Sequence, residues 1–267
     1  MKTPGILLIE ASLEGSLIPE NWRRTQFDTI SGLQKSLGYS FEVFHERIYD
    51  LNGLKNILAW CNDQNRRKNA VNGIYPTSIE FIHITSHGTK KGLELPVSVS
   101  QPDIEASEDD LAEAFSCLEN AGIKTIVLSS CETGRNQRLA KRILETTGAQ
   151  ALIGYPETAH DNVCALAEQV LYYQLLKKRV LKPTDISSAV RKTNDTLVLI
   201  GENVKRCLYC WVKEKGEIKG PCPWWNPETE ETKDDRSFVA KLAKLSENTS
   251  QSKEEKQLIR QILDLLV

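Results

Sequence analysis

Residues 123–134 read Ile-Lys-Thr-Ile-Val-Leu-Ser-Ser-Cys-Glu-Thr-Gly and combine a short apolar run with a group of small and reactive residues. The run Ile123–Ser129 is typical of a strand that is buried on both faces. Cys131 follows the end of this strand, and residues 135–146 have the pattern of a helix that ends near Gly148. The stretch therefore predicts a strand, a tight turn that carries a thiol, and a helix.

The same alternation of strands and helices continues on both sides of this stretch. Further strands are predicted at 6–11, 41–48, 79–85 and 149–155. Further helices are predicted at 25–37, 54–61, 109–118, 159–178 and 185–197. Strands that alternate with helices form a largely parallel sheet with helices on both faces, so the pattern predicts an α/β fold.

Length and composition agree with a globular protein. The chain has 267 residues, of which 40% are hydrophobic and 26% charged, which is enough for a packed core. The net charge of −2, from 34 basic and 36 acidic residues, argues against a generally nucleic-acid-binding surface. No apolar run approaches the ~18 residues of a membrane span, and the first ten residues do not fit a signal peptide. A cytoplasmic protein without membrane or nucleic-acid partners is expected.

The seven cysteines are scattered and odd in number, which does not fit a disulfide framework and favours a reducing compartment. Each is then a small buried hydrophobe, a metal ligand or a nucleophile. Cys207 and Cys210 have the spacing of a zinc knuckle, with Cys222 as a possible third ligand, but no second pair or nearby histidine completes four ligands. A strand with buried thiols is therefore favoured over a metal site, and no cofactor is expected.

Two of the predicted strands end in residues suited to nucleophilic catalysis. The strand 79–85 runs into Ser86, His87 and Gly88, and the strand that ends at Ser129 runs into Cys131. Carboxyl ends of parallel strands meet at one edge of the sheet, so neighbouring strands would place His87 beside Cys131. His87 would take the thiol proton, and the N–H groups of Gly88 and Cys131 would form an oxyanion hole. The plainer alternative is a structural cysteine and an ordinary His-Gly turn.

The residues around these two strand ends resemble a known family. Residues 81–88, Phe-Ile-His-Ile-Thr-Ser-His-Gly, resemble the His block of CHAT domains, which belong to the caspase-like clan of cysteine peptidases with separases and metacaspases. Residues 127–134, Val-Leu-Ser-Ser-Cys-Glu-Thr-Gly, closely resemble the Cys block of the same domains. Weaker likenesses follow at 148–155, 161–176 and 186–192, so the resemblance covers roughly residues 1–200.

This resemblance implies a caspase-like three-layer α/β/α sandwich and peptide-bond hydrolysis, with His87 as the base and Cys131 as the nucleophile. The chain lacks the Gln-Ala-Cys sequence of caspases, so specificity for acidic residues is not implied. In separase-like relatives, an aspartate at the place of Asp161 meets a basic side chain before the scissile bond, the P1 position. Asp161 is therefore predicted to favour Arg or Lys at P1. The alternative is that Asp161 caps the helix that follows it.

The function predicted from the sequence is that of a cysteine endopeptidase that cleaves a protein substrate. By resemblance, it would act in bacterial defence or regulated cell death, and an activating partner protein is expected because the sequence shows no sensor domain. Two alternatives remain open, a catalytically silent caspase-like scaffold or interaction module and a small-molecule hydrolase with the same pair of residues.

Three further segments carry predictions. Residues 88–110 are long and polar and predict either a mobile loop near the cleft or a surface excursion. His83 is predicted to pack in the core, with support of the site as the alternative. Residues 201–267 predict a C-terminal extension with a strand hairpin at 206–218, a loop rich in Pro and Trp, and an amphipathic helix that would pack back on the sheet or dock a partner.

Overall fold

A seven-stranded sheet forms the centre of the protein. The computed structural model describes residues 3–11, 27, 30–33, 37, 40–70, 77–95, 104–157, 161–178, 180–199 and 207–221. The strand order is β10-β9-β8-β7-β3-β1-β2. Five strands run parallel to one another, namely β1 (Thr3–Ala11), β2 (Glu42–Ile48), β3 (Thr77–Thr85), β7 (Thr125–Ser129) and β8 (Ala151–Gly154).

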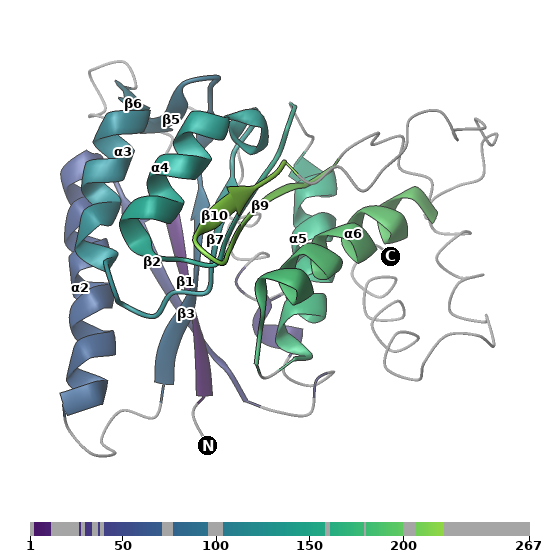
Figure 1. Ribbon diagram of the computed structural model, residues 1–267, viewed down its shortest axis with the longest axis horizontal. Helices are drawn as coiled ribbons and strands as arrows, with labels where there is room; N and C mark the ends of the chain where they lie inside the picture. Colours follow the sequence, from purple (N-terminus) through teal and green to yellow (C-terminus); the bar gives the residue numbers. More distant parts are fainter. Residues whose placement is uncertain are drawn as a thin grey trace.

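Helices cover both faces of this sheet (Figure 1). One layer holds α2 (Leu51–Ala70), α3 (Glu108–Phe115) and α4 (Gln137–Thr147), and the other holds α5 (Asp161–Leu176) and α6 (Pro183–Leu199). Each layer packs on its own apolar core, because alternate residues of each buried strand point to opposite faces. The predicted three-layer α/β/α sandwich around a largely parallel sheet is confirmed.

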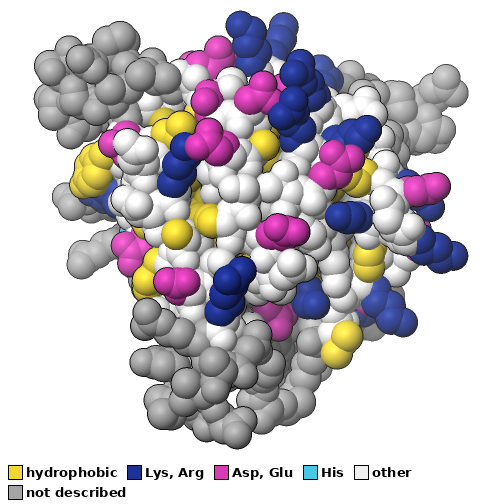
Figure 2. Space-filling view, turned by 60° about the vertical axis from the view of Figure 1, so that its left-hand side comes forward, with side chains coloured by type: hydrophobic (Ala, Val, Ile, Leu, Met, Phe, Trp, Pro, Cys, Tyr) yellow, Lys and Arg dark blue, Asp and Glu magenta, His cyan; other side chains and the backbone are white. Residues whose placement is uncertain are grey.

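Ion pairs link the helices of the first layer at the surface. Lys55 of α2 lies 2.8 Å from Glu113 of α3, and the Arg138 Nε of α4 lies 2.8 Å from Glu108 of α3. Figure 2 shows basic and acidic side chains interspersed over this side of the molecule. Because exposed pairs of this kind contribute about 0–1 kcal/mol each, the buried apolar layer beneath them supplies most of the stability.

Helix α2 is longer than predicted because its polar second half is anchored to the core. Asn65 is buried, and its amide donates to the carbonyl oxygens of Ile79 and Ala121 at 2.8 and 3.0 Å. Its Oδ1 accepts from the Ile79 N–H at 3.0 Å. One side chain thus ties the helix to the start of β3, which an apolar periodicity does not reveal. The predicted helix at 25–37 is described in part, with residues 30–33 helical and Ile30 and Leu33 buried.

The polar segment after His87 holds a second, small sheet. Strands β4 (His87–Gly88), β5 (Gly92–Leu95) and β6 (Ile104–Ser107) pair antiparallel in that order. Leu93 and Leu95 are buried against the layer of α3 and α4. Apart from the turn 89–91, the described parts of the segment 88–110 therefore form strands and the start of α3, in place of the predicted loop or excursion.

The C-terminal hairpin belongs to the central sheet. Strands β9 (Tyr209–Glu214) and β10 (Glu217–Lys219) pair antiparallel, and β9 also pairs antiparallel with β8. Cys207 and Cys210 are buried, and Cys210 lies within β9, in agreement with the predicted strand with buried thiols. The sheet thus continues past residue 200, where the sequence predicted the extension to begin. Cys222 and the predicted amphipathic helix lie outside the described residues.

Candidate active site

The two strand ends singled out in the sequence are neighbours in the sheet. Strands β3 and β7 are paired in parallel with Thr85 opposite Ser129. One step further on, the Ser86 N–H donates to the Ser129 carbonyl oxygen at 3.4 Å, and the hydroxyl oxygens of Ser86 and Ser130 are 2.9 Å apart. His87 and Cys131 come next after these two serines, at the carboxyl edge of the sheet, where parallel sheets bind their ligands.

The backbone of Gly88 lies directly against that of Cys131. A Cβ atom at Gly88 would lie 2.8 Å from the Cys131 nitrogen and 2.9 Å from the Ser130 Cβ, and it would overlap the Cys131 carbonyl oxygen. Real Cβ contacts are longer than this, so a residue with a side chain does not fit at position 88 without a shift. The structure thus brings together the two residues predicted for the oxyanion hole, whose N–H groups retain that role as a prediction.

The turn Cys131–Gly134, here called the nucleophile loop, is tightly folded. Glu132 adopts the left-handed conformation, with φ 62° and ψ −10°, which is unusual for a residue with a side chain. The Thr133 N–H donates to the Cys131 carbonyl at 2.8 Å, and the Thr133 hydroxyl donates to the Ser130 carbonyl at 2.8 Å. A 3₁₀ turn over Thr133–Arg135 follows, so α4 begins two residues later than predicted.

Two neighbouring strands hold the far end of the nucleophile loop. A Cβ atom at Gly134 would lie 2.7 Å from the Gly154 carbonyl carbon, so the loop packs closely on the end of β8. The Gly134 N–H donates to the Tyr155 carbonyl at 2.8 Å, and the Trp211 indole N–H donates to the Gly134 carbonyl at 2.9 Å. The C-terminal hairpin therefore contributes a direct contact to the loop that carries Cys131.

Trp211→Phe is expected to lower the free energy of unfolding by about 1–3 kcal/mol, because the change removes the donor to a buried carbonyl. Urea unfolding of the two proteins measures this difference. Trp60→Phe is the matched control: Trp60 is 37% exposed, so its change is expected to stay within about 0.5 kcal/mol. Equal free energies of unfolding in the two variants would show that the Trp211 hydrogen bond does not stabilise the fold.

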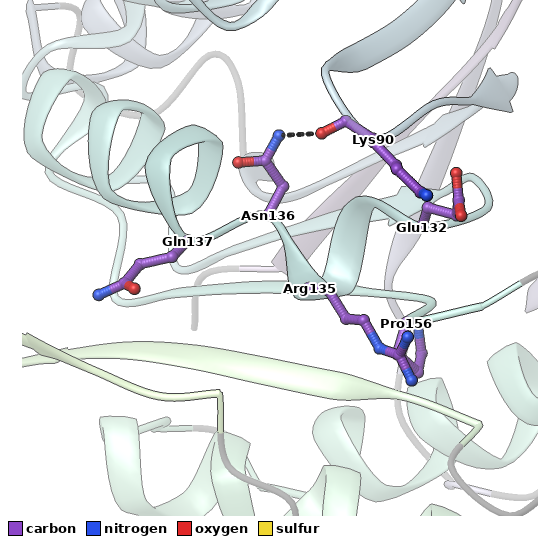
Figure 3. Close-up of a pocket in the computed structure, with 6 residues that line it drawn as sticks. All are labelled: Lys90, Glu132, Arg135, Asn136, Gln137 and Pro156. Atoms are coloured by element: carbon purple, nitrogen blue, oxygen red, sulfur yellow. Dashed lines mark hydrogen bonds between the residues drawn. The ribbon is translucent and has the colours of Figure 1, made fainter.

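The site is open to solvent and adjoins a cavity. His87 is exposed and Cys131 is half-buried. Glu132, which directly follows Cys131, is one of the residues that line a cavity of about 320 Å³, together with Lys90, Arg135, Asn136, Gln137 and Pro156 (Figure 3). The Asn136 amide donates to the Lys90 carbonyl at 2.9 Å and bridges the segments that follow His87 and Cys131. The cavity thus lies between the two segments that carry the candidate catalytic residues.

Two other described cysteines, Cys61 and Cys164, are poor nucleophiles because of their surroundings. Burial raises the pKa of the Cys61 thiol to about 12, with a smaller contribution from Cys117. Burial also raises the pKa of Cys164, and the nearby charge of Glu168 raises it further. Since the thiolate is the reactive form, Cys61 and Cys164 stay largely unreactive at neutral pH. Cys131 is the cysteine at the end of a central strand beside a histidine.

A buried polar network beneath the site was not predicted from the sequence. Glu168 of α5 is 1% exposed, and its carboxylate accepts hydrogen bonds from Ser129 and Tyr155. His83 is buried as predicted, but it also takes part in this network, with its Nε2 3.6 Å from Glu168 Oε2. The signal available in the sequence was one acidic residue, followed by Gln169, inside the mostly apolar helical stretch 163–173.

The remaining predicted site residue is Asp161. It is the first residue of α5, and its side chain lies outside the described residues, so its place in a P1 pocket stays a prediction.

Among the described residues, no group of three or more His, Cys, Asp and Glu side chains is placed to hold a metal ion. None of the described helices is long and apolar enough to cross a membrane.

Comparisons with known proteins support the fold. No model of a protein family and no curated protein matches the chain. The fold is similar to the X-ray structure of a secreted C11 cysteine protease from Bacteroides thetaiotaomicron in complex with an irreversible peptide inhibitor, with a TM-score of 0.51 and 12% sequence identity. The match covers 79% of this chain and 66% of that chain, so it spans just under two thirds of the protease. The caspase-like fold is thereby confirmed.

Proposed function

We propose that this chain is a cysteine endopeptidase with Cys131 as the nucleophile and His87 as the base. The observation that carries the proposal is the pairing of β3 with β7, which continues through Ser86 and Ser130 and presents the next residues, His87 and Cys131, at one edge of the sheet. The similarity in fold to a C11 cysteine protease supports the same reading.

The mechanism would proceed through an acyl-enzyme. His87 takes the proton from the Cys131 thiol, and the sulfur attacks the carbonyl carbon of the scissile peptide bond. The N–H groups of Gly88 and Cys131 donate to the oxyanion of the tetrahedral intermediate. The intermediate collapses to a thioester when the C–N bond breaks, and His87 gives its proton to the leaving amine. His87 then takes a proton from water, whose oxygen attacks the thioester and releases the carboxylate product and the free thiol.

Several features of the site favour a polypeptide as the substrate. His87 is exposed, so an extended chain can approach the pair from solvent. The cavity lined by Lys90, Glu132 and Arg135 adjoins the nucleophile and offers room for a residue next to the scissile bond. We further propose a protein substrate in a defence or cell-death pathway and activation by a partner protein.

Cleavage of a proteome-derived peptide library tests the proposal, because sequencing the new termini reports both hydrolysis and the P1 residue. The wild type is expected to cut after Arg and Lys at least about 30-fold more efficiently than after other residues, as expected for a cation that meets a carboxylate. The Cys131→Ala protein is the blank. A library left uncut by an activated wild type would favour a scaffold instead.

Asp161→Asn is expected to reduce the preference for Arg and Lys to less than about threefold while cleavage after other residues continues, because the amide removes the proposed partner of the cation. Fluorogenic peptides that differ only at P1 measure the change. Asp195→Asn, an exposed aspartate of α6, is the control and should keep the wild-type preference. An unchanged preference in Asp161→Asn would assign Asp161 to helix capping.

A further inference from the structure

One buried carboxylate is connected to both ends of the nucleophile loop. At the entry, the Ser129 hydroxyl donates to Glu168 Oε1, and Ser129 lies two residues before Cys131. At the exit, the Tyr155 hydroxyl donates to the same oxygen at 3.0 Å, while the Tyr155 backbone carbonyl accepts from the Gly134 N–H at 2.8 Å. Cys131 therefore lies on a short loop whose two ends are both tied to one oxygen of α5.

Ser129 is also fixed from its other side. Its carbonyl accepts from the Ser86 N–H at 3.4 Å, and Ser86 directly precedes His87. Ser129 is half-buried, whereas Tyr155 and Glu168 are each 1% exposed. The network thus reaches the surface of the site at Ser129 and is closed to water below it. A hydrogen bond made in such surroundings is stronger and more rigid than one made in water.

The second carboxylate oxygen faces histidine rather than solvent. Glu168 Oε2 lies 3.6 Å from His83 Nε2, and His83 Nδ1 lies 3.0 Å from the Tyr172 hydroxyl oxygen. Burial lowers the pKa of His83 more than the Glu168 charge raises it, so the imidazole is neutral at neutral pH. Burial, with the Glu168 charge, also raises the pKa values of Tyr155 and Tyr172, so both phenols stay protonated and able to donate.

We propose that Glu168 is a positioning residue, which holds Cys131 in its reactive place by binding the Ser129 and Tyr155 hydroxyls with one carboxylate oxygen. The kinetic consequences of this inference rest on the proposed function, whereas the anchoring of the nucleophile loop by Glu168 is independent of it. A buried carboxylate is costly to desolvate, so its presence in α5 points to a specific task that its hydrogen bonds serve. Misplacing a reacting group by about 1 Å costs up to about 10²-fold in rate.

The arrangement predicts different results for two substitutions of Glu168. Glutamine keeps a carbonyl oxygen where Oε1 accepts both hydroxyls, and its NH₂ group can donate to the neutral His83 Nε2. Glu168→Gln is therefore expected to keep kcat within about fivefold of the wild type. Leucine has a similar size and no acceptor, so Glu168→Leu is expected to lower kcat by about 10²-fold with KM changed less than about threefold.

Hydrogen exchange tests the structural content without any substrate. In Glu168→Leu, the Thr133 and Gly134 amides are expected to exchange at least about tenfold faster than in Glu168→Gln, because the loop loses both anchors. Tyr155→Phe removes one anchor with little change of shape, and it is expected to raise Gly134 exchange by about threefold or more. This variant keeps the test decisive if Glu168→Leu does not fold.

Asn65→Leu is the matched control, because Asn65 is also a buried side chain with several backbone hydrogen bonds but holds the opposite end of β3. It should lower stability without changing loop exchange or kcat. Equal loop exchange in Glu168→Leu and Glu168→Gln, or equal loss of kcat in both, would overturn the proposal. Faster loop exchange in Glu168→Leu together with no peptide hydrolysis by the activated wild type would support the positioning role and overturn the proposed function.

Discussion

Cys131→Ala is expected to lower peptide hydrolysis by at least about 10⁴-fold, because removing the nucleophile of an acyl-enzyme mechanism leaves only substrate binding and oxyanion stabilisation. The fold should be unaffected, since Cys131 is half-buried and an alanine side chain fits in the same space. The measurement is kcat/KM on the best peptide from the library, together with the midpoint of thermal unfolding, which should stay within a few degrees of the wild-type value.

Cys117→Ala is the control for this experiment. Cys117 is also half-buried, and its thiol donates to the Ala114 carbonyl rather than facing His87. Hydrolysis by this variant should match that of the wild type. If Cys131→Ala kept a tenth or more of the wild-type activity, Cys131 would not be the nucleophile.

Gly88→Ala is expected to lower kcat/KM by at least about 10²-fold, the second largest effect. The new methyl group would overlap the Cys131 carbonyl oxygen and lie 2.8 Å from the Cys131 nitrogen, and both are backbone atoms. One strand end must therefore move, which displaces the nucleophile and both predicted oxyanion donors together. Forcing an extra methyl into a packed site also costs about 1–3 kcal/mol in the free energy of unfolding. Kinetics and urea unfolding measure the two effects.

Gly32→Ala is the matched control, because it makes the same substitution at a position where a methyl group fits without contact. Gly32 lies in the helical stretch 30–33, and a Cβ atom there would meet nothing within 4 Å. Because alanine is the better helix former, this variant should be as stable as the wild type or more stable by up to about 1 kcal/mol, with full activity. Full activity in Gly88→Ala would mean that close approach of the two strand ends is not required.

The parts of the structure that follow from local pattern were predictable. The mostly apolar runs at 79–85 and 123–129 predicted two central strands because a strand buried on both faces is rich in apolar residues. His87 and Cys131 stood out because they follow these runs. Their adjacency followed from parallel topology together with the family resemblance. The caspase-like sandwich could therefore be predicted from the sequence, whereas the narrower likeness to CHAT domains remains a prediction.

The contacts that hold the nucleophile loop were not predictable because they join residues far apart in the chain. Trp211 meets Gly134 only because β9 pairs with β8, and β9 belongs to the segment that the sequence placed outside the core. Glu168 meets Ser129 because α5 packs on the face of the sheet toward which Ser129 points. Side-chain hydrogen bonds of this kind leave no periodic signal, as the buried Asn65 of α2 also shows.

Covalent labelling with an irreversible peptidyl electrophile, followed by peptide mapping, tests the central claim most directly, because the chain carries its own internal controls in six other cysteines. We predict a single adduct on Cys131 in the wild type, formed at least about tenfold more slowly in His87→Ala, and none at that position in Cys131→Ala. Adducts spread over several cysteines, or equal labelling rates in the wild type and His87→Ala, would contradict the account.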